Sequence, residues 1–257
     1  MPRFAANLTM MFTEWDFLDR FAAAADAGFD AVEYLFPYDH PAETIAKKLA
    51  DNGLTQALFN LPPGDWATGE RGIAALPGRE AEFEASVTTA LAYAEATGAK
   101  RLHVMAGLAD RADPAAVATY RGNVVRAAER LAAAGVALLL EPINRRDMPG
   151  YFLNDFSWTA TLIGELGLAN VKLQYDVYHR QILHGDVVRS LEALMPIVGH
   201  VQIAAVPARN EPGTGELDDF RVFATLDALG YDGFVGCEYR PAAATIDGLR
   251  WLDRARG

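Results

Sequence analysis

Residues 135–144 read GVALLLEPIN, and this stretch decides the fold. Gly135 has the position of a residue that ends a helix, five apolar residues then form a short run, and Glu141 follows directly. A glycine after a helical pattern, followed at once by a continuous apolar run, is typical of a joint between a helix and a buried strand. Continuous rather than alternating apolar residues favour a parallel strand that is covered on both faces.

The same joint recurs along the chain. Seven glycines are predicted to end a helix before such a run: Gly28, Gly53, Gly98, Gly135, Gly167, Gly199 and Gly230. The runs that follow are AVEYLF, TQALFN, RLHVMAG, VALLLEPI, VKLQYDVYH, HVQIAAV and GFVGCEY, and the opening FAANLTM adds an eighth. Between these runs, apolar residues recur at a spacing of three or four, as in Phe83, Val87, Leu91 and Ala94. This spacing predicts a helix between each pair of consecutive strands.

Eight alternating strand and helix units predict an α/β fold, a single-domain (β/α)8 TIM barrel that spans residues 1–257. A doubly wound open sheet is the competing architecture. The sequence favours the barrel because no glycine-rich phosphate-binding motif follows the first strand.

The net charge, the cysteine content and the length of the apolar runs disfavour several classes of function and cellular location. The formal net charge of -11 disfavours binding to nucleic acid or to an anionic membrane. Cys237 is the only cysteine, so no intramolecular disulfide can form. No apolar run reaches the roughly 18 residues of a membrane helix, and the first residues do not resemble a signal peptide. We therefore expect a cytoplasmic protein, and we leave a homo-oligomer open because no helix face is distinctive.

Polar residues at strand ends are the candidates for chemistry, because barrel enzymes place their active sites at the carboxyl ends of the strands. Glu141, Asp176 and Glu238 each follow an apolar run, and Gln202 lies nearer the start of its run, with His200 on the same face. Each acid alone would be explained by a helix cap or an arginine partner. Together, three converging carboxylates would repel each other unless they are protonated or bound to a cation, and a divalent metal resolves this conflict. Oxygen ligands favour Mg2+ or Mn2+.

Three further residues are candidates for substrate binding. His179 lies three residues after Asp176, where it could donate a hydrogen bond to a substrate oxygen. Arg209 and Arg240 could each bind a substrate carboxylate, and we favour Arg209. Trp66 lies in a long loop, residues 61–79. We interpret this loop either as a lid over the active site or as a rigid surface loop that its prolines and Trp66 hold in place. No function is assigned from the sequence to the remaining histidines, which are His40, His103 and His184.

Eight segments together resemble the hydroxypyruvate isomerase family, within the wider group of xylose-isomerase-like barrels. They are MPRFAANLTMMFTE, FDAVEYLFPYDH, LFNLPPGDWATGERGIAALPGRE, LLLEPIN, QYDVYHRQ, HVQIA, RNEPGTGE and GCEYRP. The resemblance runs from end to end and implies that Glu141 and Glu238 transfer the proton. It also implies that Asp176 and Gln202 complete the metal site, although many relatives in the wider group carry a histidine where this chain has Gln202.

The activity implied by this resemblance is the interconversion of hydroxypyruvate and tartronate semialdehyde through an enediolate, with a small hydroxy-oxo acid as the partner. A 2-oxo-tetronate isomerase or a ketose 3-epimerase is the alternative within the isomerases. From other classes we consider a non-catalytic sugar-acid binding protein and an apurinic endonuclease, which the acidic charge disfavours.

Overall fold

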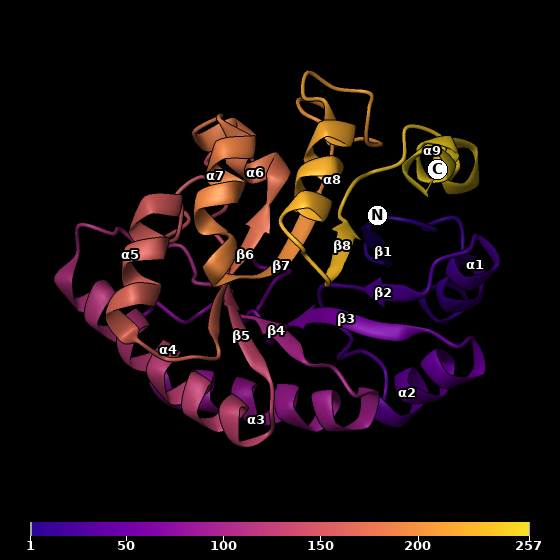
Figure 1. Ribbon diagram of the computed structural model, residues 1–257. Helices are drawn as coiled ribbons and strands as arrows, with labels where there is room; N and C mark the ends of the chain where they lie inside the picture. Colours follow the sequence, from indigo (N-terminus) through magenta and orange to yellow (C-terminus); the bar gives the residue numbers. More distant parts are fainter. Residues whose placement is uncertain (1, 257) are drawn as a thin grey trace.

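The computed structural model describes residues 2–256 and shows a closed parallel barrel, which confirms the predicted fold (Figure 1). Each strand pairs with its sequence neighbours, and β8 closes the barrel against β1. This closure excludes the open doubly wound sheet. The strands are β1 Arg3–Asn7, β2 Ala31–Glu33, β3 Thr55–Asn60, β4 Arg101–His103, β5 Ala137–Leu140, β6 Val171–Asp176, β7 Val198–Ile203 and β8 Phe234–Cys237.

Helices form the outer layer around the strands (Figure 1). The α-helices are α1 Arg20–Asp26, α2 Ala42–Asp51, α3 Glu80–Thr97, α4 Pro114–Ala133, α5 Phe156–Leu166, α6 Val177–Leu183, α7 Val187–Leu194, α8 Asp219–Ala228 and α9 Arg250–Arg256. Short 3-10 turns are η1 Phe17–Asp19, η2 Met195–Ile197 and η3 Thr245–Gly248. Within residues 2–256, no helix is both long and apolar enough to cross a membrane.

Helix ends follow the local chemistry of the sequence. Gly98 and Gly167 adopt the left-handed conformation that ends α3 and α5, with φ of 73° and 63°. The side chains of Asp113 and Asp155 accept hydrogen bonds from backbone N–H groups in the first turns of α4 and α5. These signals fix where each strand begins and therefore where its carboxyl end emerges.

The prediction for Gly199 is wrong, because this glycine lies inside β7 rather than after a helix. The preceding chain ends in the 3-10 turn η2, which contains Pro196. Glycine is needed in the strand for space: an added Cβ would lie 2.6 Å from Cβ of Lys172 and 2.8 Å from Cδ2 of Leu139. Glycine is therefore required at position 199 by close packing against residues of other strands, and it does not mark the end of a helix.

Candidate active site

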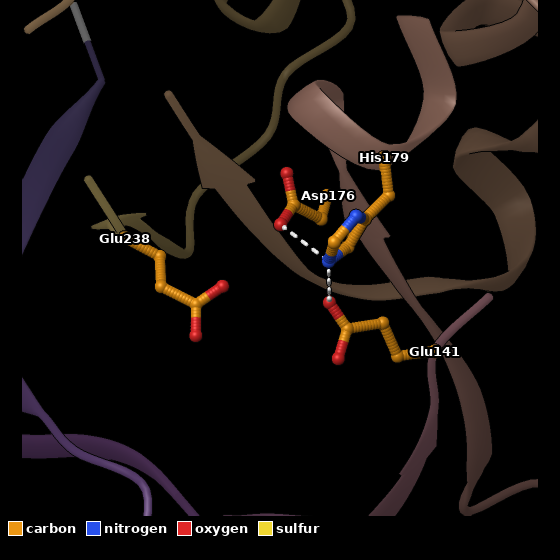
Figure 2. A group of neighbouring side chains, drawn as sticks. All are labelled: Glu141, Asp176, His179 and Glu238. Carbon is orange, nitrogen blue, oxygen red and sulfur yellow. Dashed lines mark ion pairs between the residues drawn. The ribbon is translucent and has the colours of Figure 1, made fainter. Parts of the chain in front are cut away.

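Three acidic side chains meet at the carboxyl end of the barrel, as the strand pattern predicts (Figure 2). Glu141 follows β5, Asp176 ends β6 and Glu238 follows β8. Together with His179 in the first turn of α6, they are buried, and each offers a ligand atom within 4.8 Å of the others. Glu141 and Glu238 come from strands on different walls of the barrel, so they approach the shared space from different sides.

Asp176 has two roles that its local structure separates. Its Oδ1 caps α6 by accepting a hydrogen bond of 2.8 Å from the N–H of Tyr178. Its Oδ2 is buried and accepts no hydrogen bond from residues 2–256. The cap holds the side chain in place, and the second oxygen faces the cluster with a free lone pair.

The cluster fits a cation. Oε1 of Glu141 is likewise buried and without a hydrogen-bond partner among the described residues. Burial, and then the neighbouring carboxylates Glu238 and Asp176, raise the pKa of Glu141 well above its usual value. Burial also raises the pKa of Asp176 and that of Glu238, the latter to about 8, against the opposing charge of Arg209. A hard divalent ion with oxygen ligands would remove this mutual repulsion.

His179 is held as a hydrogen-bond donor. Oδ1 of Asn144 accepts from the N–H groups of Arg146 and Asp147, both at 2.9 Å, so Nδ2 of Asn144 must face the ring. That Nδ2 lies 2.7 Å from Nδ1 of His179, which therefore accepts and leaves the proton on Nε2. Nε2 lies 3.5 Å from Oδ2 of Asp176. Asn144 thus selects the tautomer that directs an N–H into the cluster.

Arg209 reaches the same space from the loop after β7. Its Nη2 lies 2.7 Å from Oε2 of Glu238 and 3.7 Å from Oδ2 of Asp176. Burial disfavours the charged form, but the surrounding carboxylates outweigh it and raise the pKa of Arg209 above its usual value. The guanidinium group also lies over the ring of Tyr178, 4.8 Å from its centroid. Arg240, the alternative clamp, is largely exposed.

Gln202 stands beside Asp176 in the register of β6 and β7. Its Nε2 donates to Oε1 of Glu33 at 2.8 Å, and its Oε1 accepts from Nε2 of Gln174 at 2.6 Å. Glu33 also accepts from Asn7 at 3.0 Å and lies 2.7 Å from Nε2 of His200. This buried network below the cluster holds the Gln202 amide in one orientation.

Sequence reasoning overlooked Glu33 and gave His103 no function. Glu33 is the third residue of the predicted strand AVEYLF, and the observed β2 ends at this acid. An acid inside an otherwise apolar run is the signal that could have been used. His103 ends β4 and is buried, with its Nε2 3.5 Å from Oε2 of Glu141. Burial, and secondarily His200, lowers the pKa of His103 to about 3. His40 and His184 instead contact the rings of Phe17 and Phe156.

A cavity of about 550 Å³ opens above the cluster. Its wall includes Trp66 and Arg71 from the long loop, with the Arg71 guanidinium 4.1 Å from the centroid of the indole ring. The loop is fastened by a β-bridge between Gly72 and Ala106 and by the ion pair of Glu70 with Arg79. The predicted loop therefore covers part of the cavity and is anchored at its base.

A closed parallel barrel with a buried acidic cluster at its mouth defines the class, a barrel enzyme with a candidate metal centre. The family model described as xylose isomerase-like TIM barrel matches residues 21–255, and the chain belongs to this family. It is an enzyme of the isomerase class, as its curated relatives indicate.

Two of these relatives cover the chain almost completely. The 2-oxo-tetronate isomerase of Cupriavidus necator is 57% identical, over 98% of both chains. The hydroxypyruvate isomerase of Escherichia coli is 45% identical, over 100% of both chains. A crystal structure from Brucella melitensis, described as an AP endonuclease of family 2, is 49% identical with a TM-score of 0.96 over 99% of both chains.

Proposed function

We propose that this protein moves a hydrogen between the adjacent C3 and C2 carbons of a short 2-oxo acid that carries a hydroxyl group on C3. The substrate class comprises hydroxypyruvate, which would give tartronate semialdehyde, and its four-carbon analogue 2-oxo-tetronate. The observation that carries the proposal is the convergence of Glu141, Asp176 and Glu238 on one buried space from different strands. Such a set combines a metal site with two carboxylates that can exchange protons with a substrate between them.

A divalent metal, Mg2+ or Mn2+, would be held by Glu141, Asp176 and Glu238, with Gln202 as a further oxygen ligand. The bond from Gln174 occupies one lone pair of the Gln202 oxygen and leaves the other free. When bound, the ion would stabilise negative charge on the substrate oxygens as a Lewis acid. The unpartnered oxygens of Glu141 and Asp176 support this assignment.

The two glutamates would transfer the proton. One glutamate, as carboxylate, would take the proton from C3 to give an enediolate, and the other, as carboxylic acid, would give a proton to C2 from the other side of the substrate. The proton of the C3 hydroxyl group would pass to the C2 oxygen, and exchange with solvent would return both glutamates to their starting protonation states. In the metal-free site, burial and the neighbouring carboxylates raise the pKa of both glutamates, that of Glu238 to about 8, so the empty cluster can hold a proton near neutral pH. The Nε2–H of His179 would donate to a substrate oxygen beside them, because its tautomer is fixed by Asn144.

Arg209 would bind the substrate carboxylate. Its guanidinium group is already charged and directed into the cavity, and it presents paired N–H donors suited to a carboxylate. Binding of the acid would draw Arg209 from Glu238 and free that carboxylate to act. A neutral ketose has no carboxylate that could compete with Glu238 for this arginine, which favours an acid substrate over a ketose.

Trp66 and the surrounding loop would exclude water from the enediolate. An isomerase is also favoured over a nuclease by charge. A net charge of -11 opposes association with a polyanion, and the buried cluster is reached through a cavity suited to a small molecule.

The test is turnover of hydroxypyruvate and 2-oxo-tetronate by the Mg2+-loaded enzyme, with neutral ketoses as comparison. We expect conversion of at least one acid, incorporation of solvent deuterium, and loss of at least about 100-fold in kcat in Glu141→Gln and Glu238→Gln. Circular dichroism checks their folding. Folded variants with near-normal turnover would exclude the two glutamates as the proton-transfer pair.

A further inference from the structure

One side of the cavity carries polar groups that the proposed chemistry does not use. Asn60 ends β3 and His103 ends β4, and the two residues are partners in the register of these strands. Both are buried, at 7% and 1% exposure, and both line the cavity. They are neighbours on the wall that lies beyond Glu141, on the side away from Asp176.

His103 has an unusual environment for a buried histidine. Neither Nδ1 nor Nε2 has a hydrogen-bond partner within the part of the chain that the structure describes. The contact between Nε2 and Glu141, at 3.5 Å, is longer than a good hydrogen bond. A buried polar group without a partner is costly, so such a group at a cavity wall points to a ligand.

Asn60 is held through its backbone rather than its side chain. Its N–H donates to the carbonyl of Leu35 at 2.9 Å, and its carbonyl accepts from the hydroxyl of Tyr38 at 2.6 Å. These bonds fix the strand end and do not use the side-chain amide of Asn60, a residue that lines the cavity together with His103. The neighbouring wall residues Met105 and Ile143 are apolar and cannot satisfy either group.

The order of the strands indicates the direction in which a bound substrate would extend across the cavity. Arg209 reaches the cluster from the side of β7 and β8, while Asn60 and His103 lie on β3 and β4, across Glu141. A 2-oxo acid with its carboxylate on Arg209 and its reacting carbons at the cluster would extend its remaining carbon toward β3 and β4. Hydroxypyruvate ends at C3 and has no atom for this side of the cavity.

We propose that Asn60 and His103 form a subsite for the C4 hydroxyl group of a four-carbon substrate, so that the enzyme prefers 2-oxo-tetronate to hydroxypyruvate. The inference rests on the proposed function and assigns its substrate length. A hydroxyl group is both donor and acceptor, and a neutral imidazole beside an amide matches it on both counts. The cavity of about 550 Å³ does not exclude the longer acid by size.

The expected selectivity comes from unsatisfied groups. When the three-carbon acid binds, water is displaced but the imidazole and the amide gain no partner, which disfavours the complex. The four-carbon acid supplies that partner. We therefore expect kcat/KM for 2-oxo-tetronate to exceed that for hydroxypyruvate by at least about tenfold in the wild type.

The experiment measures kcat/KM for both acids in wild type, His103→Ala and Asn60→Ala. Each variant should lower the ratio of kcat/KM for 2-oxo-tetronate to kcat/KM for hydroxypyruvate by about tenfold to hundredfold. His103→Gln, which restores a donor and an acceptor, should recover part of the preference. His184→Ala, a histidine outside this cavity, is the matched control and should leave both values unchanged.

The outcomes separate the two proposals. Equal losses on both acids would mean that His103 acts on Glu141 and would overturn the subsite, as would an unchanged ratio. A wild-type enzyme that turns over neither acid would contradict the proposed function and the subsite with it. Binding of threonate against glycerate to the Mg2+-loaded protein gives a readout without turnover, and the threonate preference should disappear in His103→Ala.

Discussion

Gly236→Ala tests the buried network that supports the candidate metal site. Gly236 lies in β8, and a Cβ added there would lie 2.2 Å from Oε2 and 2.4 Å from Oε1 of Glu33. A flexible carboxylate could move away at little cost. Glu33 is not free in this way, because Asn7 and Gln202 donate to it and His200 lies within hydrogen-bond distance.

The magnitude follows from the distances. Ordinary contact begins at 3.4 Å, so Oε2 must recede by about 1.2 Å. Oε1, at 2.4 Å, must recede by about 1.0 Å. The two displacements break the 2.7 Å contact of Oε2 with His200 and the 2.8 Å bond from Gln202 to Oε1. Two lost bonds to a carboxylate, at about 1.5 kcal/mol or more each, and overpacking of about 1 kcal/mol or more give a destabilisation of about 4 kcal/mol.

Urea denaturation of the metal-free protein measures this cost. Gly164→Ala is the matched control, because Gly164 lies in α5 with nothing within 4 Å of an added Cβ, and it should be neutral or stabilising by up to about 1 kcal/mol. Glu33→Ala combined with Gly236→Ala should be less destabilised than the sum of the single variants, since the clash is then gone. A Gly236→Ala protein within about 0.5 kcal/mol of wild type would refute the reasoning.

Three further predictions concern the metal, the loop and pH. Chelation should abolish turnover and added Mg2+ or Mn2+ restore it, while Asp176→Asn should weaken Mn2+ binding, measured by electron paramagnetic resonance, at least about tenfold; unaffected turnover after chelation would exclude the metal. Trp66→Ala should lower kcat more than about tenfold and leave Mn2+ affinity within about twofold, with the exposed Trp15→Ala as control; parallel loss of both would count against water exclusion. Asp219 is buried and burial raises its pKa from 3.8 to about 6, so its contribution to stability is complete below pH 3.8 and is lost as pH rises through about 6. Asp219→Asn should therefore exceed wild type in unfolding free energy above pH 6, by at most about 3 kcal/mol, with a difference that vanishes toward pH 4 in urea titrations; a difference independent of pH would contradict this assignment.

The sequence alone determined the barrel and the place of its acidic residues. Apolar runs that follow helix-ending glycines report backbone direction, and this signal is local. Because parallel strands in a barrel deliver their carboxyl ends to one mouth, Glu141, Asp176 and Glu238 could be expected to meet before any coordinates were known. Gly199 shows the limit of the glycine signal, since its cause is packing against Lys172 on another strand.

Only the tertiary structure decided how the polar groups are partnered. Glu33 and His200 are 167 residues apart in the chain and 2.7 Å apart in space, and no periodicity connects them. The tautomer of His179 depends on the side-chain amide of Asn144, in the loop after β5. Neither ring nitrogen of His103 has a hydrogen-bond partner among residues 2–256, which only the packing around it determines. Periodic patterns specify which face of an element is buried, whereas hydrogen bonding is set by atoms that folding brings within about 3 Å.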